Sequence, residues 1–155
     1  MATLVSNPDD LLNMAGRDLG VTSWVGVDQN AVDTFAQVTL DQQWIHIDPE
    51  RSASGPFGVT IAHGFFTLSL CSHFFGELLT VHNVAMVINY GLDRVRFPSP
   101  LTVGSRVRAH GALQEAAARA DAVQTVTRLT VQAEGAEKPT CVADLVSRFY
   151  PRGSE

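Results

Sequence analysis

Residues 61–80 read IAHGFFTLSLCSHFFGELLT and form the most apolar stretch of the 155-residue chain. Large apolar side chains occur along its whole length, at Phe65, Phe66, Leu68, Leu70, Phe74, Phe75, Leu78 and Leu79. A helix over these residues is apolar on every side and must therefore be covered on every side. The covering layer has to extend along the whole length of this helix.

The second half of the chain supplies such a layer. Residues 122–134, 140–150 and 106–114 alternate apolar and polar side chains with a period of two, which is typical of strands with one buried face. Shorter strands are expected over residues 84–90 and 94–97. Long antiparallel strands around one long helix predict an α+β hot-dog fold, in which an antiparallel β-sheet is wrapped around a long central α-helix.

The first half of the chain indicates shorter elements. Residues 1–20 are expected to form a short helix and a connecting loop, and residues 24–28 a short strand. Asn30 is predicted to cap a helix, because asparagine is a favoured residue at that position. Asp48 followed by Pro49 predicts a further helix start, with the carboxylate as cap and proline as first helical residue.

Composition and charge restrict the class of protein. With 45% hydrophobic and 17% charged residues, we expect one globular domain over residues 1–155. A net charge of −5 and scattered basic residues argue against a nucleic-acid partner. We see no signal peptide or membrane span, and we expect a soluble cytoplasmic protein. Cys71 and Cys141 lack CxxC spacing and are expected to be buried, reduced thiols.

Residues 41–50, DQQWIHIDPE, carry much of the titratable chemistry. We expect Asp41 and His46 in a loop between two short helices, where a carboxylate and an imidazole can move protons to and from one water molecule. A turn-capping Asp41 and a packed His46 remain the structural alternative, and Asp48 is better explained as a helix cap. His46, Asp48 and His63 are potential metal ligands, but no HxxxH or HExxH pattern joins them, and no metal is expected.

The motif TIAHGFF, residues 60–66, places Gly64 near the start of the apolar helix. The first N–H groups of a helix lack intrahelical partners and lie at the positive end of its dipole. Without a Cβ, Gly64 allows a ligand oxygen to approach the backbone, where an enolate oxygen can be stabilised. The alternative is a glycine needed only for close packing. His63 is expected to orient neighbouring groups rather than act as a base.

Together these segments resemble a known family. DQQWIHIDPERSA (residues 41–53) and GPFGVTIAHGFFTLSL (55–70) resemble the MaoC-like dehydratases, the (R)-specific enoyl-CoA hydratases with a hot-dog fold. The family pattern is matched in order by Asp41, His46, Asp48-Pro49 and His63-Gly64. YGLDRVRFPSPLTVGSRV (90–107) is similar to the strand pair that follows the family's helix, and the resemblance covers about residues 30–150.

The resemblance implies a reaction and the residues that carry it. Asp41 and His46 would activate the water that adds to a trans-2-enoyl-CoA, giving an (R)-3-hydroxyacyl-CoA. The backbone N–H of Gly64 would polarise the thioester carbonyl, and Ser72 would support the hydrogen bonds of the site. No cofactor is implied, because CoA belongs to the substrate, although an acyl carrier protein remains an alternative carrier.

One departure from the family concerns substrate range. Many members have Asn-Pro between the acid and the histidine, where this chain has Gln43-Trp44. Gln43 still offers an amide, but Trp44 changes the shape of the loop. We expect the acyl pocket to be lined by Phe65, Phe66 and Leu70. Candidate contacts to the CoA phosphates are Arg94, Arg96 and Arg106.

The oligomeric state and two alternative functions also have to be considered. We expect a homodimer in which two sheets join edge to edge. The alternatives are a hot-dog acyl-CoA thioesterase and a non-catalytic module that binds acyl thioesters. A thioesterase would place its carboxylate on the central helix, where only Glu77 is available, too far along the helix to meet Gly64.

Overall fold

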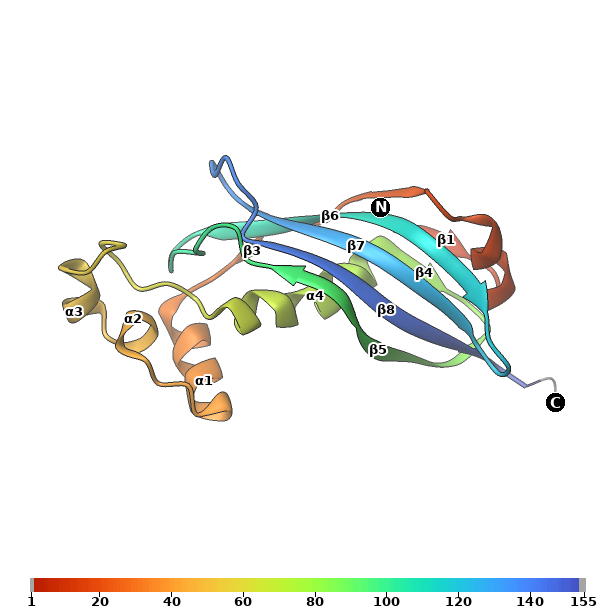
Figure 1. Cartoon of the computed structure of the whole chain (residues 1–155), viewed down its shortest axis with the longest axis horizontal. Coiled ribbons are helices and arrows are strands. Elements are labelled where there is room, and N and C mark those ends of the chain that lie inside the picture. The colour runs from red at the N-terminus through yellow and green to blue at the C-terminus, as the bar shows by residue number, and fades with distance from the viewer. Residues whose placement is uncertain (1, 154–155) are drawn as a thin grey trace.

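The computed structural model describes residues 2–153, in which a twisted antiparallel sheet packs over a long helix, α4 (Gly64–Leu78) (Figure 1). The strand order is β2-β6-β7-β8-β5, and β3 also pairs with β6, at Arg106 and Val107. The strands of this sheet are β2 (Asp18–Val21), β3 (Val25–Gly26), β5 (Val84–Arg96), β6 (Arg106–Ala118), β7 (Val123–Ala133) and β8 (Cys141–Pro151). This is the predicted α+β hot-dog arrangement of a sheet wrapped around a helix.

The core lies between α4 and the inner face of the sheet. Burial alternates strictly along β7, as the period of two in the sequence predicts, and Leu129 and Val131 are fully buried. Phe74 of α4 is also fully buried against this face. The strongest sequence pattern and the strongest packing therefore coincide in the centre of the sheet.

The structure corrects four details of the predicted elements. The helix is shorter than residues 61–80 and is not covered on every side, since the Phe65 side chain is 69% exposed. Residues 79–81 instead form β4 (Leu79–Val81), which pairs in parallel with β1 (Thr3–Val5). The N-terminal region contains the expected short helix, the 3-10 helix η1 (Pro8–Asn13), but also strands β1 and β2. The two strands predicted over 84–97 are the single strand β5.

Three helices lie together near the N-terminal end of α4 (Figure 1): α1 (Gln29–Thr39), α2 (Trp44–Ile47) and α3 (Pro49–Ala53). The predicted cap Asn30 is wrong by two residues, because the Asp28 carboxylate accepts the Ala31 N–H (2.8 Å). Asp48 caps α3 as predicted and accepts the Arg51 N–H (2.9 Å). No helix within residues 2–153 is long and apolar enough to cross a bilayer.

Candidate active site

Asp41, His46 and His63 come together beside the start of α4. Asp41 lies in the loop after α1, His46 in α2 and His63 directly before α4. One ligand atom from each side chain lies within 4.8 Å of the other two. The spacing of Asp41 and His46 predicts their proximity, although His46 sits on a helix rather than in a loop. His63 joins them because the chain returns to this point before entering α4.

The hydrogen bonds of His46 fix its tautomer. Its Nδ1 lies 2.7 Å from the carbonyl oxygen of Ile61, which can only accept, so Nδ1 carries the hydrogen. The Nε2 atom is therefore left with a free lone pair, as a general base requires. Burial lowers the pKa of His46, and the nearby His63 lowers it further, while the Ile61 carbonyl and the Asp41 carboxylate act in the opposite direction. These effects favour the neutral, proton-accepting imidazole.

His63 contacts both other members of the cluster. Its ring stacks on the His46 ring with centroids 3.8 Å apart and planes 24° from parallel. Its Nε2 donates to the main-chain carbonyl of Asp41 at 2.9 Å, and Phe35 packs against the ring at 5.1 Å. Its Nδ1 is buried and has no partner among the described residues. This geometry agrees with an orienting rather than a proton-transferring histidine.

The same stacking bears on metal binding. A metal ion lies about 2.0–2.1 Å from each ligating imidazole nitrogen, in line with its lone pair. The stacked His46 and His63 rings direct their lone pairs within nearly parallel planes, so one ion cannot lie in the plane of both. Asp48, the carboxylate considered with them from the sequence, caps α3 instead. The absence of a metal from the chemistry stays a prediction, with this geometry in its favour.

Gly64 begins α4 with its amide available. Among the described residues, neither a side chain nor a carbonyl accepts the Gly64 N–H. A Cβ added to Gly64 would lie 3.0 Å from the Phe97 ring, so only glycine fits here without movement of that ring. The close-packing role and the amide-donor role are therefore compatible at this position.

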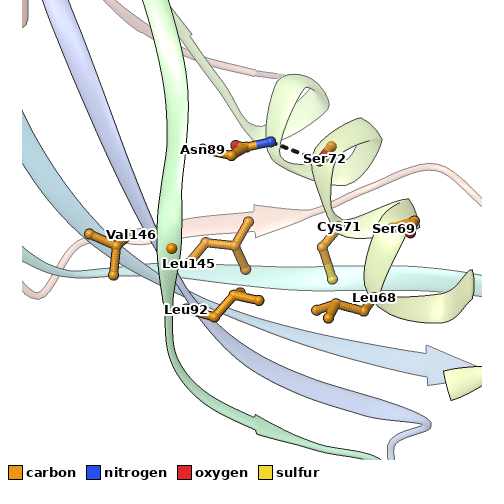
Figure 2. Close-up of a pocket in the computed structure, with 9 residues that line it drawn as sticks. Leu68, Ser69, Cys71, Ser72, Asn89, Leu92, Leu145 and Val146 are labelled. Atoms are coloured by element: carbon orange, nitrogen blue, oxygen red, sulfur yellow. Dashed lines mark hydrogen bonds between the residues drawn. The ribbon is translucent and has the colours of Figure 1, made fainter. Parts of the chain in front are cut away.

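A cavity of 260 Å³ lies between α4, β5 and β8 (Figure 2). Leu68 and Ser72 line it, one and two helical turns beyond Gly64 on the same side of α4. The other lining residues are Ser69, Cys71, Asn89, Gly91, Leu92, Leu145 and Val146. None of the three residues predicted to line an acyl pocket, Phe65, Phe66 and Leu70, lines this cavity. Ser72 hydrogen-bonds Asn89 at 3.2 Å in this cavity (Figure 2).

Gln29, which the sequence did not single out, holds the segment that carries His46. Its Nε2 donates to the main-chain carbonyl of His46 at 2.7 Å, and its Oε1 accepts the Thr60 hydroxyl at 2.6 Å. The predicted amide donor, Gln43, is exposed and forms no side-chain cap at the start of α2. A glutamine at a helix start gives no sequence signal for a contact seventeen residues away.

Comparison with known proteins gives a consistent result. The MaoC like domain family matches residues 10–135. A 3-hydroxyacyl-thioester dehydratase Z of Mycobacterium tuberculosis is 48% identical over 141 residues, covering 90% of this chain and 93% of the relative. Nodulation protein N of Rhizobium leguminosarum bv. viciae is 44% identical over 141 residues, with 89% and 88% covered.

A solved structure supports the fold. The R-hydratase PhaJ1 of Pseudomonas aeruginosa superposes with a TM-score of 0.68 at 22% identity, covering 90% of this chain and 83% of that chain.

Proposed function

Because the chain belongs to the MaoC-like domain family, and is thereby a hydratase or dehydratase, we propose that it reversibly hydrates trans-2-enoyl-CoA to (R)-3-hydroxyacyl-CoA. The observation that carries this proposal is the meeting of Asp41 and His46 beside the free amide of Gly64. Removal of water from the hydroxyacyl product uses the same groups in reverse, in keeping with the name of the mycobacterial relative.

In the proposed mechanism, the dyad takes one proton from water and later returns it to the substrate. The Asp41 carboxylate accepts one hydrogen of a water molecule and orients it. The Nε2 of His46 takes the other proton as the water oxygen bonds to C3 of the enoyl group. Electrons move to the thioester oxygen, where the Gly64 N–H and the helix dipole stabilise the enolate. The dyad then returns the proton to C2.

Two features support an acyl-CoA as substrate. The cavity of Figure 2 follows Gly64 along α4, where an acyl chain attached to a bound thioester would lie. Among the candidate arginines, Arg106 is engaged by Glu134, with Nε 2.9 Å from the carboxylate. Arg94 lies opposite Asp144 in the pairing of β5 with β8. Arg96 bonds only its own neighbour's carbonyl among the described residues and is the better candidate for a phosphate contact.

The thioesterase alternative finds less support. Glu77 lies roughly 20 Å along α4 from Gly64, by the rise of a helix. Its carboxylate accepts the Ser23 N–H at 2.9 Å and lies 2.9 Å from His73. Glu77 is thus occupied with structural contacts at the far end of the helix.

One assay separates the three functions. Purified protein is incubated with crotonyl-CoA while enoyl absorbance and free thiol are followed together. Loss of absorbance without thiol supports hydration, thiol release indicates a thioesterase, and binding with neither change indicates a non-catalytic module. Full activity after dialysis against EDTA is expected if no metal takes part.

Variants of the dyad test the assigned residues. Asp41→Asn and His46→Gln are each expected to lower kcat by roughly a hundredfold or more, the usual contribution of a proton-transfer group. His73→Gln is the matched control, because this histidine is exposed and contacts Glu77 and Phe74, away from the dyad. Wild-type turnover by both dyad variants would show that the dyad is wrongly assigned.

We also propose that the enzyme is a homodimer joined through β5. Within residues 2–153 this strand pairs with β8 alone, which leaves the backbone groups of its other side without a strand partner. Its exposed apolar side chains are Met86, Val87, Ile88, Tyr90 and Leu92. A long apolar strand with a free side promotes association unless it is paired, and a second β5 related by a two-fold axis pairs it.

A further inference from the structure

The inner face of β5 has an irregular spacing. Register partners on the inner face of β8 identify Val87, Asn89, Leu92 and Val95 as the inward residues of β5. The intervals between these residues are two, three and three, because the register shifts between Asn89 and Gly91 and again between Leu92 and Arg94. Each bulge adds a residue and bends the strand. Asn89 and Leu92 consequently face α4 together, although a regular strand would place them on opposite faces.

The bulges account for the cavity and for its polar end. Leu92 points inward yet stays 45% exposed, since β5 does not close against α4 at this level. Leu68, Leu92 and Leu145 form the apolar part of the cavity (Figure 2). The Asn89 amide donates to the Ser72 hydroxyl at 3.2 Å and forms a polar boundary on one side of that part (Figure 2).

The distance from Gly64 to this polar boundary sets the length of acyl chain that the apolar part of the cavity can hold. Ser72 is eight residues beyond Gly64, which corresponds to about 12 Å along the helix axis. An extended chain advances roughly 1.2 Å per bond, so about ten bonds span this distance. A longer hydrocarbon chain would have to bury the amide and hydroxyl without replacing their hydrogen bonds to water, which is unfavourable.

From this geometry we propose that Asn89, aimed inward by the bulge at Tyr90, is a specificity-determining residue that limits the substrate to short and medium acyl chains of up to about ten carbons. The inference rests on the proposed function. It assigns Asn89 the role of ending the apolar part of the pocket, with Ser72 as its hydrogen-bonding partner.

The test compares enoyl-CoA substrates of increasing chain length. For the wild type, kcat/KM is expected to fall steeply between decenoyl-CoA and hexadecenoyl-CoA. In Asn89→Leu the apolar wall continues, and the ratio of hexadecenoyl to crotonyl kcat/KM is expected to rise roughly tenfold or more. Ser72→Ala, which removes the partner hydroxyl from the helix side, is expected to change the ratio in the same direction. Asn13→Leu, in η1 and remote from the cavity, is the matched control and leaves the ratio unchanged.

A second measurement keeps this test independent of turnover. Saturated acyl-CoAs from butyryl to palmitoyl are titrated into each variant by calorimetry, and Asn89→Leu is expected to tighten palmitoyl-CoA relative to butyryl-CoA. An unchanged chain-length profile of Asn89→Leu in both measurements overturns the inference while leaving hydration intact. Absence of hydration by the wild type overturns the proposed function instead, and the binding series then still decides the role of Asn89.

Discussion

The His63 side chain contacts both members of the proposed dyad, through the stacked His46 ring and the Asp41 carbonyl. His63→Phe keeps a ring for stacking but loses the hydrogen bond, whereas His63→Gln keeps a donor and loses the stack. Each is expected to lower kcat by roughly tenfold to a hundredfold with a smaller effect on KM, because small displacements of catalytic groups are costly. Steady-state kinetics measures the effects on kcat and KM separately, and unchanged kcat in both variants would contradict the positioning role.

Burial of His46 has a consequence for pH dependence. Since its pKa is lowered from the ordinary 6.5, the neutral base persists to lower pH, and kcat/KM should fall on the acid side with a midpoint below 6.5. The same shift makes the folded state lose stability as pH falls through the unfolded value, because the unfolded chain binds the proton more readily. Histidine NMR titration, with His46→Gln to assign the resonance, measures the pKa directly. A value at or above 6.5 would contradict this reasoning.

Gly64 has two roles that can be tested separately. Its lack of a Cβ leaves room for the Phe97 ring, and its amide is the proposed oxyanion donor. In Gly64→Ala the new methyl meets the Phe97 ring at 3.0 Å and the ring or the helix start has to shift. We expect kcat/KM to fall by roughly a hundredfold, the usual effect of losing an aligned oxyanion donor. The double variant Gly64→Ala/Phe97→Leu should recover part of the loss if displacement is the cause, with Phe97→Leu as its control. If activity does not recover, the new methyl group lowers activity by blocking the approach of the ligand to the Gly64 amide.

At the scale of elements, the sequence best predicts the helices and strands whose side chains pack into the core. The alternating strands β6, β7 and β8 and the apolar helix α4 are predicted because one buried face leaves a periodic signature. The sequence predicts two strands in place of β5, because the bulges of β5 break the period of two. The sequence does not predict strands β1 and β2, because they have three and four residues, too few for any period to show.

The site follows the same division. Asp41 with His46, and Gly64, are predicted from two local motifs, and the family resemblance joins these two motifs into one site. Gln29 and Asn89 contact residues seventeen positions away or more, and nothing in a local pattern indicates such contacts. The bulge that aims Asn89 is a property of strand pairing and becomes visible only with the register of β5 and β8.

The pairing of β7 with β8 includes an ion pair whose stabilising effect depends on pH. The Arg128 guanidinium contacts both carboxylate oxygens of Asp144 at 2.7 and 2.8 Å, and the Asp144 side chain is 8% exposed. These hydrogen bonds hold the pKa of Asp144 below its ordinary value. The stabilisation is therefore present above the unfolded pKa and is lost as pH falls through the folded one.

Asp144→Asn is expected to lower the free energy of unfolding at pH 7 by about 1–2 kcal/mol, a moderate value because Arg128 is partly solvated. Urea denaturation at pH 7 and in the acid range measures the difference, which should shrink in acid. The exposed pair of Arg106 and Glu134 provides the control, and Glu134→Gln should leave the unfolding midpoint unchanged. A difference for Asp144→Asn that is constant across pH would show that packing, not charge, is responsible.

At the scale of the whole molecule, the proposed dimer depends on the free side of β5. Two copies of β5 paired about a two-fold axis bring equivalent residues close together, so introduced like charges face each other. Met86→Lys/Ile88→Lys is therefore expected to convert a dimer into a monomer while the fold is retained, as measured by analytical ultracentrifugation and circular dichroism. Val38→Lys is the matched control, because Val38 is 78% exposed on α1 and lies outside β5. A wild-type chain that sediments as a monomer, or that dimerises equally well with both lysines present, would mean that the free side of β5 is covered by something other than a second copy.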